Sequence, residues 1–325
     1  MITWILVMGC TSEPAQCMAG YERSDSGYCE RVIENKKEEP GPEDTADPED
    51  TADETDPLPE SCQVEAGYSG ESVGQVDCTG GICEVPAGAF WMGSDEGLMD
   101  ECPPRQIQLS AFGIDATEVT RSAFSSCVAQ GACEAVPSHC DDLFREWGQG
   151  ADARDPDQAP AICTTWQQAT DYCEWVGGRL PTEAEWEKAA RGEEGAVWAW
   201  GHSPPDCQAA NFRFVSWYCQ ESVIEVASYA DYSSPYGLWD TVGNAWEWVE
   251  DFYDAGWYED ATDTDPQSPE TCRDLVGGTP RDCVDKVIRG GAFNTTENTT
   301  RGSARAFTDP GTVDNNLSFR CAYDR

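Results

Sequence analysis

Basic residues are scarce in this chain, and their scarcity excludes several kinds of partner. The 325 residues include 20 Lys and Arg against 61 Asp and Glu, so the formal net charge at pH 7 is −41. Nucleic-acid binding draws most of its free energy from a basic surface that neutralises phosphates, and adhesion to anionic lipid headgroups needs such a surface too. We therefore expect no nucleic-acid partner, and contact with a membrane only through an anchor.

Histidine is scarcer still, since only His139 and His202 are present. Two histidines cannot form a three-histidine iron site, and nothing in their spacing favours a two-histidine, one-carboxylate site. The paired C-x-x-C spacing of a zinc ribbon is also absent. The 17 cysteines are therefore interpreted mainly as disulfide partners, which predicts an oxidising location in the cell envelope or outside the cell.

The first nine residues form a short apolar run that ends in Val7-Met8-Gly9-Cys10. A helix needs about 20 residues to span a bilayer, so this run cannot cross one. It resembles the signal of a bacterial lipoprotein, which is cleaved before a cysteine that then receives lipid. The resemblance implies that residues 1–9 are a signal, that Cys10 is the lipid attachment site and that the protein is an outer-membrane lipoprotein. The alternative is that Cys10 is one more disulfide partner, although without it the other 16 cysteines form an even number.

Three segments separate this end from the folded body. Residues 10–33 form a small loop in which Cys17 and Cys29 are expected to pair. Residues 34–60 consist largely of Pro, Glu, Asp and Thr, with almost no apolar surface to bury, so we expect a disordered acidic linker. Residues 61–83 are a short cysteine-rich lead-in to one domain over residues 84–325.

The body from residue 84 onward is rich in Gly and Trp. Three segments begin with a capping threonine and end at a glycine, which predicts three helices: Thr120 to Gly131, Thr164 or Thr165 to Gly177, and Thr182 to Gly192. Short β-favouring runs, such as residues 89–92 and 286–289, alternate with turns. The pattern predicts an α+β domain with little regular secondary structure, held by disulfides.

Six motifs stand in a fixed order in this body: residues 88–94, 118–120, 178–192, 236–240, 243–248 and 289–293. Ser318-Phe319-Arg320-Cys321 follows as a closing motif. Together they resemble the formylglycine-generating enzyme, or sulfatase-modifying factor, family. The resemblance covers about three quarters of the chain and implies a variant of the C-type lectin-like fold.

The resemblance fails at the family's reactive position. Family enzymes use O₂ and a copper(I) ion, held between two thiolates, to oxidise the cysteine of a Cys-x-Pro-x-Arg sequence in a sulfatase to Cα-formylglycine. Aligned from the Arg-Gly-Gly motif, the two thiol positions fall at Thr295 and Thr300 and the family's active-site serine at Ala292. No cysteine lies between Cys283 and Cys321. A threonine hydroxyl is a poor Cu(I) ligand, so copper is not expected and the oxidase reaction should be lost.

Calcium is the ligand that the resemblance still implies. The family's calcium ligands match a set of four residues here: Asp240, Gly243, Ala245 and Glu247. A second family site is matched only in part, by Asn211 and Phe212. The alternative is that residues 243–248 form only a packed turn with buried indoles.

Two further features follow from the resemblance: Cys173 and Cys321 match a family disulfide, and Trp246 would line the family's groove. The preferred interpretation is a non-catalytic, calcium-stabilised and surface-anchored module that binds a peptide, protein or glycan. Scaffold motifs kept beside missing thiols favour it. Two alternatives stay open: an oxidoreductase of the formylglycine-generating type with thiols recruited from elsewhere, such as Cys272 or Cys283, and a structural component of the envelope.

Overall fold

The computed structural model describes residues 21–23, 29–31, 78–95, 97–141, 155–269, 271–274 and 278–325. The expected signal, Cys10, Cys17 and the acidic linker lie outside the described residues. Cys29 lies in β2 (Cys29–Arg31), which pairs with β1 (Tyr21–Arg23). No helix in the described ranges is long and apolar enough to cross a membrane.

The three predicted helices are confirmed as α1 (Arg121–Ala129), α3 (Trp166–Trp175) and α4 (Glu183–Arg191). Each begins at a threonine whose hydroxyl accepts a backbone N–H, and the cap of α3 is Thr165 rather than Thr164. In α3 and α4 the cap is reciprocal, because the side chains of Gln168 and Glu185 accept the backbone N–H of the capping threonine. Two single turns were not predicted: α2 (Ser138–Asp141) and α5 (Trp257–Asp260).

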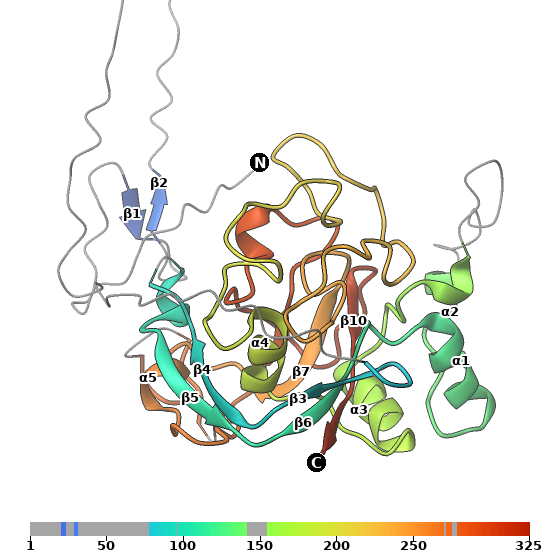
Figure 1. The fold of residues 1–325 in the computed structure, drawn as a ribbon, viewed down its shortest axis with the longest axis horizontal. Helices are drawn as coiled ribbons and strands as arrows, with labels where there is room; N and C mark the ends of the chain where they lie inside the picture. Colours follow the sequence, from blue (N-terminus) through green and yellow to red (C-terminus); the bar gives the residue numbers. More distant parts are fainter. Residues whose placement is uncertain are drawn as a thin grey trace, which may run out of the picture.

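The strands form small sheets, as the alternation of short runs and turns predicted (Figure 1). Two antiparallel strands, β4 (Gly88–Met92) and β5 (Arg105–Leu109), make one sheet. A second has the order β11-β6-β3, from β3 (Ile82–Val85), β6 (Phe112–Asp115) and β11 (Ala322–Asp324). The third has the order β10-β7-β8-β9, from β7 (Trp246–Phe252), β8 (Lys286–Arg289), β9 (Ala306–Thr308) and β10 (Leu317–Phe319). Short 3-10 turns lie in the connecting segments: η2 (Met99–Glu101) between β4 and β5, η4 (Pro156–Gln158) between α2 and α3, and η5 (Glu297–Thr299) between β8 and β9.

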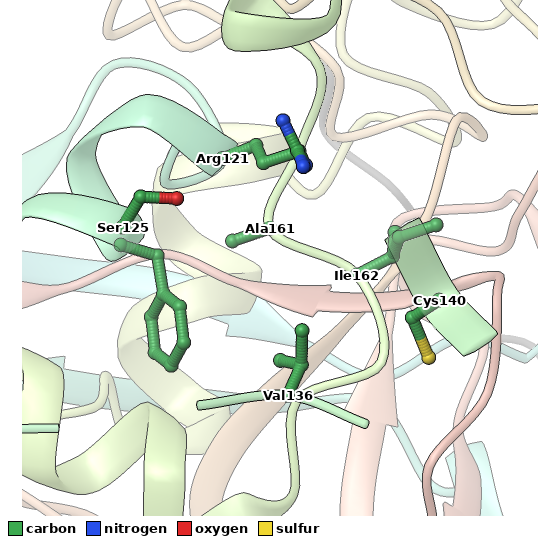
Figure 2. A pocket seen from close by; sticks show the side chains of 7 residues that line it. Arg121, Ser125, Val136, Cys140, Ala161 and Ile162 are labelled. Atoms are coloured by element: carbon green, nitrogen blue, oxygen red, sulfur yellow. The ribbon is translucent and has the colours of Figure 1, made fainter. Parts of the chain in front are cut away.

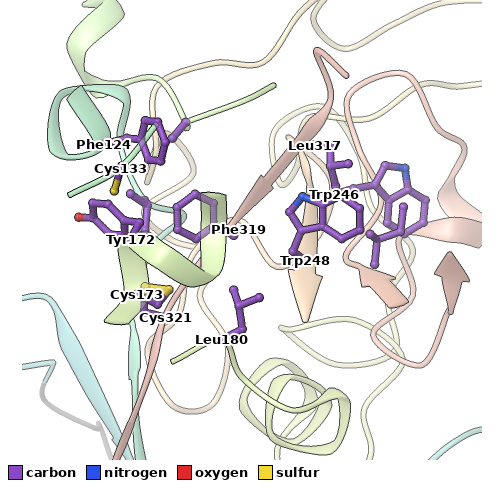
Figure 3. Packing of buried hydrophobic residues seen from close by; sticks show 14 of the residues in the cluster. Phe124, Cys133, Tyr172, Cys173, Leu180, Trp246, Trp248, Leu317, Phe319 and Cys321 are labelled. Carbon is purple, nitrogen blue, oxygen red and sulfur yellow. A yellow bond between two sulfur atoms is a disulfide. The ribbon is translucent and has the colours of Figure 1, made fainter. Parts of the chain in front are cut away.

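Disulfides tie distant parts of this domain together. The predicted bond between Cys173 in α3 and Cys321 next to β10 is present, beside packed aromatic rings of Tyr172 and Phe319 whose centroids lie 5.5 Å apart (Figure 3). Five more pairs lie among the described residues: Cys78–Cys83, Cys127–Cys133, Cys140–Cys163, Cys207–Cys219 and Cys272–Cys283. The structure therefore confirms a disulfide-rich α+β domain.

Helix α4 is buried along its whole length. Its Glu183 accepts hydrogen bonds from Arg289 and Arg305, and its Glu187 accepts from Arg191 and Arg289. Burial alone would raise the pKa of Glu187, but the two guanidinium groups hold it below its usual value. Paired charges, rather than apolar contacts alone, thus fill the centre of the domain.

Candidate functional site

The family's thiol positions lie in the loop that follows β8. Gly290 and Gly291 open the loop with φ of 93° and 75°, a left-handed backbone that favours glycine. The Thr295 hydroxyl donates to the carbonyl of Ala292 at 3.0 Å and accepts that residue's N–H at 2.9 Å. The Thr300 hydroxyl donates to the carbonyl of Glu297 at 2.8 Å. Both hydroxyls are therefore engaged by their own loop.

Gly291 lies against both threonines and leaves no room for a side chain of its own. A Cβ atom placed on Gly291 would lie 2.7 Å from Thr300 Cγ2 and 3.1 Å from Thr295 Oγ1. Thr300 and Ala292 are fully buried, while Thr295 is half-buried. A position closed in this way, with hydroxyls in place of thiols, does not fit a copper(I) ion.

Thiols recruited from elsewhere are not found in the described part of the chain either. From Cys78 onward, every cysteine that the structure describes is in a disulfide. Cys272 and Cys283, named as candidates from the sequence, are bonded to each other. The alternative of an oxidoreductase with relocated thiols therefore loses the two cysteines on which it depended.

Three of the expected calcium ligands, Asp240, Gly243 and Ala245, lie in the turn that leads into β7, and Glu247 lies in β7 itself. The turn is tight, with left-handed φ at Asp240 (61°) and Gly243 (81°), and a Cβ on Gly243 would collide with the backbone of Asn211. The Asp240 carboxylate accepts the N–H of Ala227 at 2.6 Å and shares a hydrogen bond with the carboxyl of Glu118. Burial raises the pKa of Asp240 to about 6 and that of Glu118 well above its usual value.

Glu247, unlike Asp240, is paired with an arginine. Its two carboxylate oxygens accept hydrogen bonds from Arg320 at 2.6 and 2.7 Å, and one also accepts from the indole of Trp186 at 2.8 Å. Neither Glu118 nor Asp240 has a salt bridge to a described Lys or Arg, although the positive charge of Arg320 offsets part of the effect of burial on both carboxyls.

The donor chemistry at this turn fits calcium in part. Buried carboxylate oxygens next to a tight turn are ligands that Ca²⁺ accepts. However, no three His, Cys, Asp or Glu side chains in the described ranges gather closely enough to hold a metal ion. A calcium ion here would depend on backbone carbonyls, such as those of Gly243 and Ala245, beside Asp240 and Glu118.

The second family calcium position is represented by Asn211 and Phe212. The Asn211 amide donates to the carbonyl of Ser222 at 3.0 Å and to Asn244 Oδ1 at 3.2 Å. Its own Oδ1 is buried with no hydrogen-bond partner among the described residues. Phe212 is fully buried in a hydrophobic cluster. One orphaned oxygen thus marks this position, but the described residues include no group of three or more His, Cys, Asp or Glu side chains that could hold a metal ion.

Trp246, expected to line a groove, packs in the cluster of buried side chains with Trp248 and Leu317 (Figure 3). Only 7% of its surface remains exposed. A small pocket of about 40 Å³ lies elsewhere, beside α1, and Figure 2 shows Arg121 and Ile162 at its edge. Its volume suits a few water molecules or one small side chain, not a peptide.

Comparison with known proteins decides the family. Residues 73–325 match the family described as "Sulfatase-modifying factor enzyme 1-like domain". The chain belongs to this family. The match begins inside the lead-in segment expected at residues 61–83 and runs to the carboxyl end.

Relatives within the sulfatase-modifying factor family differ in what their names state. The formylglycine-generating enzyme of Streptomyces coelicolor is 30% identical over 295 residues, which cover 76% of this chain and 90% of the enzyme. The "Inactive C-alpha-formylglycine-generating enzyme 2" of Bos taurus is 29% identical, over 74% of this chain and 87% of that protein. The "Serine/threonine-protein kinase pkn1" of Chlamydia pneumoniae is 33% identical over 73% of this chain, but the matched part is only 37% of the kinase.

Solved structures confirm the fold. PvdO from Pseudomonas aeruginosa matches with a TM-score of 0.57 at 22% identity, over 75% of this chain and 94% of that one. Treponema denticola variable protein 1 matches with a TM-score of 0.56 at 21% identity, over 74% and 94% of the two chains. The domain has the sulfatase-modifying factor fold.

Proposed function

We propose that this protein is a non-catalytic member of the sulfatase-modifying factor family that serves as an exported, lipid-anchored binding module. The observation that carries the proposal is the closed loop around Gly291, where Thr295 and Thr300 stand in place of the family's thiols. The disulfides support an oxidising location, and Cys10 would supply the anchor. A relative in Bos taurus that is named as inactive shows that loss of activity has a precedent in the family.

The direct test is incubation of the purified chain with a Cys-x-Pro-x-Arg peptide, copper and reductant, followed by mass spectrometry of the peptide. We expect no conversion of thiol to aldehyde, because no thiolate is available to hold Cu(I) at this loop. The Streptomyces coelicolor enzyme is the positive control. Substantial aldehyde product from the wild-type chain would contradict the proposal.

A pair of variants separates the role of the threonines from the rest of the fold. Thr295→Cys/Thr300→Cys places two thiols at the family positions, and in reductant it should compete for Cu(I) with a chromophoric chelator. Thr295→Ser/Thr300→Ser, which keeps hydroxyls, should not. Copper uptake by the serine variant would show that this loop is not what excludes the metal.

Calcium is proposed to stabilise the module at the turn before β7. Adding EDTA should lower the melting temperature by about 5–10 °C, as expected when a ligand present at about 100 times its Kd is removed from a domain of this size. Asp240→Asn should abolish this response, whereas the exposed Asp309→Asn should keep it. An unchanged melting temperature after EDTA would count against the calcium site.

The tight packing of Gly291 against Thr295 and Thr300 also favours a second function, a structural role in the envelope. Such a role predicts that the chain co-purifies from membranes in a fixed ratio with other envelope proteins. A binding module would instead act through a surface other than the family's reactive position.

A further inference from the structure

Large apolar side chains gather on one exposed loop of the domain, residues 213–219. Val215, Trp217 and Tyr218 expose 62%, 53% and 41% of their surfaces. Single exposed apolar residues are common, but three within four positions form a patch of the kind that marks an interaction site. We call residues 213–219 the aromatic platform. It belongs to the long connection between α4 and β7, whose loops run along the upper side of Figure 1.

The platform is rigid. The Cys207–Cys219 disulfide closes its base, and Arg213 and Tyr218 pair across it as an antiparallel bridge. The rings of Phe214 and Trp217 stack with centroids 4.3 Å apart and planes 19° apart. One face of the Trp217 indole rests on Phe214, while about half of the residue's surface (53%) stays open to solvent. A preorganised surface binds with a smaller entropy loss than a flexible loop.

The stack is also anchored to the interior and to the loop described above. Phe214 lies against Phe212 with ring centroids 4.8 Å apart, and Phe212 is fully buried. The N–H of Arg213 donates to the carbonyl of Thr295 at 2.8 Å. The platform therefore sits beside the position where the family carries its thiols.

Charge narrows the class of ligand. From Cys207 to Gln220 the sequence contains one charged residue, Arg213, in a chain with 61 acids. The guanidinium of Arg213 lies over the Tyr218 ring, 5.7 Å from its centroid. The Arg213 guanidinium already over the Tyr218 ring disfavours a second cation on the platform, while the net charge of −41 repels anions. Charge complementarity thus favours a neutral ligand.

We propose that the aromatic platform binds a neutral oligosaccharide, with one pyranose ring stacked on the open face of Trp217. The C–H bonds on one face of such a ring are weakly positive and match the negative face of an indole. Its hydroxyl groups would find donors and acceptors in the exposed Ser216, the Tyr218 hydroxyl and Arg213. The inference rests on the proposed binding function and names its ligand class.

The test measures binding of four neutral hexasaccharides, cellohexaose, chitohexaose, mannohexaose and maltohexaose, to the full chain by calorimetry. We expect saturable binding of at least one sugar, weakened at least about tenfold by Trp217→Ala, because an aromatic anchor at the centre of a site contributes that much. Trp175→Ala is the matched control, since Trp175 is 37% exposed on α3, outside the platform. Both variants should keep the wild-type melting temperature.

Three outcomes would overturn the inference. One is no saturable binding of any of the four sugars at millimolar concentration. Another is equal affinity of the Trp217→Ala and Trp175→Ala variants. The third is that Trp217→Ala weakens binding to phosphatidylcholine vesicles but not to sugars, which would make the platform a membrane contact. Each outcome is independent of aldehyde formation, so it leaves the proposed loss of catalysis unaffected.

Discussion

Glu187→Ala is expected to lower the free energy of unfolding by about 3–5 kcal/mol, the cost of removing one partner from a buried charge pair. Glu187 is fully buried and accepts hydrogen bonds from Arg289 at 2.6 Å and from the Tyr258 hydroxyl at 2.7 Å. Arg191 and the N–H of Gly93 use its other oxygen. Without the carboxylate, two guanidinium groups would lose their shared partner inside the domain. The loss is a large part of a typical domain's stability.

Urea denaturation followed by tryptophan fluorescence measures this effect. Glu194→Ala is the matched control on the same segment, since Glu194 is exposed, and it should change the free energy by no more than about 0.5 kcal/mol. Similar midpoints for the two variants would mean that the buried charges around α4 contribute little to stability.

Removal of the Cys173–Cys321 bond by paired alanine substitutions should lower the free energy of unfolding by about 5 kcal/mol in chain-entropy theory. The bond closes a loop with a sequence separation of 148 residues. The Cys207–Cys219 bond spans a separation of only 12, so the same theory gives about 3 kcal/mol for its removal. A disulfide that closes a longer loop stabilises the fold more, because it removes more conformational freedom from the unfolded chain.

The two double variants, compared in urea under non-reducing conditions, test this order. The larger drop should belong to Cys173→Ala/Cys321→Ala. A larger drop for Cys207→Ala/Cys219→Ala would show that the short bond stabilises chiefly by holding its loop in shape rather than by restricting the unfolded chain.

Local rules predicted the helices well because their signals are local. Thr120, Thr165 and Thr182 each cap a helix through a backbone group three residues away, and Gly192 ends α4 with a left-handed φ of 76°. Such signals depend on a few consecutive residues. Helix boundaries therefore followed from the sequence to within a residue or two.

The buried charges could not be predicted in the same way. Glu187 and Arg191 have the spacing of an exposed ion pair on a helix surface, and nothing near them in the sequence marks them as buried. The partners that accompany this burial, Arg289 for Glu187 and Arg305 for Glu183, lie more than 100 residues further along the chain. Only the tertiary fold brings those partners to α4.

The same difference between local and long-range signals applies to the candidate site. The absence of thiols at Thr295 and Thr300 was visible in the sequence, because it needs only residue identities. Two contacts were not visible in the sequence: the packing of both threonines on Gly291 and the pairing of Glu247 with Arg320. Glu118 was missed as a partner of Asp240, although its motif had been noted, because the contact joins residues far apart in the chain.

From Cys78 to Cys321, the described cysteines leave no pair of free thiols to hold copper. Alkylation of the unreduced, denatured protein, followed by digestion and mass spectrometry, tests it most directly. The account predicts that peptides containing the described cysteines, from Cys78 to Cys321, carry no alkyl group, because each of these cysteines is in a disulfide. Alkylation of two of them to a similar and substantial extent would contradict the account and reopen the case for an oxidase.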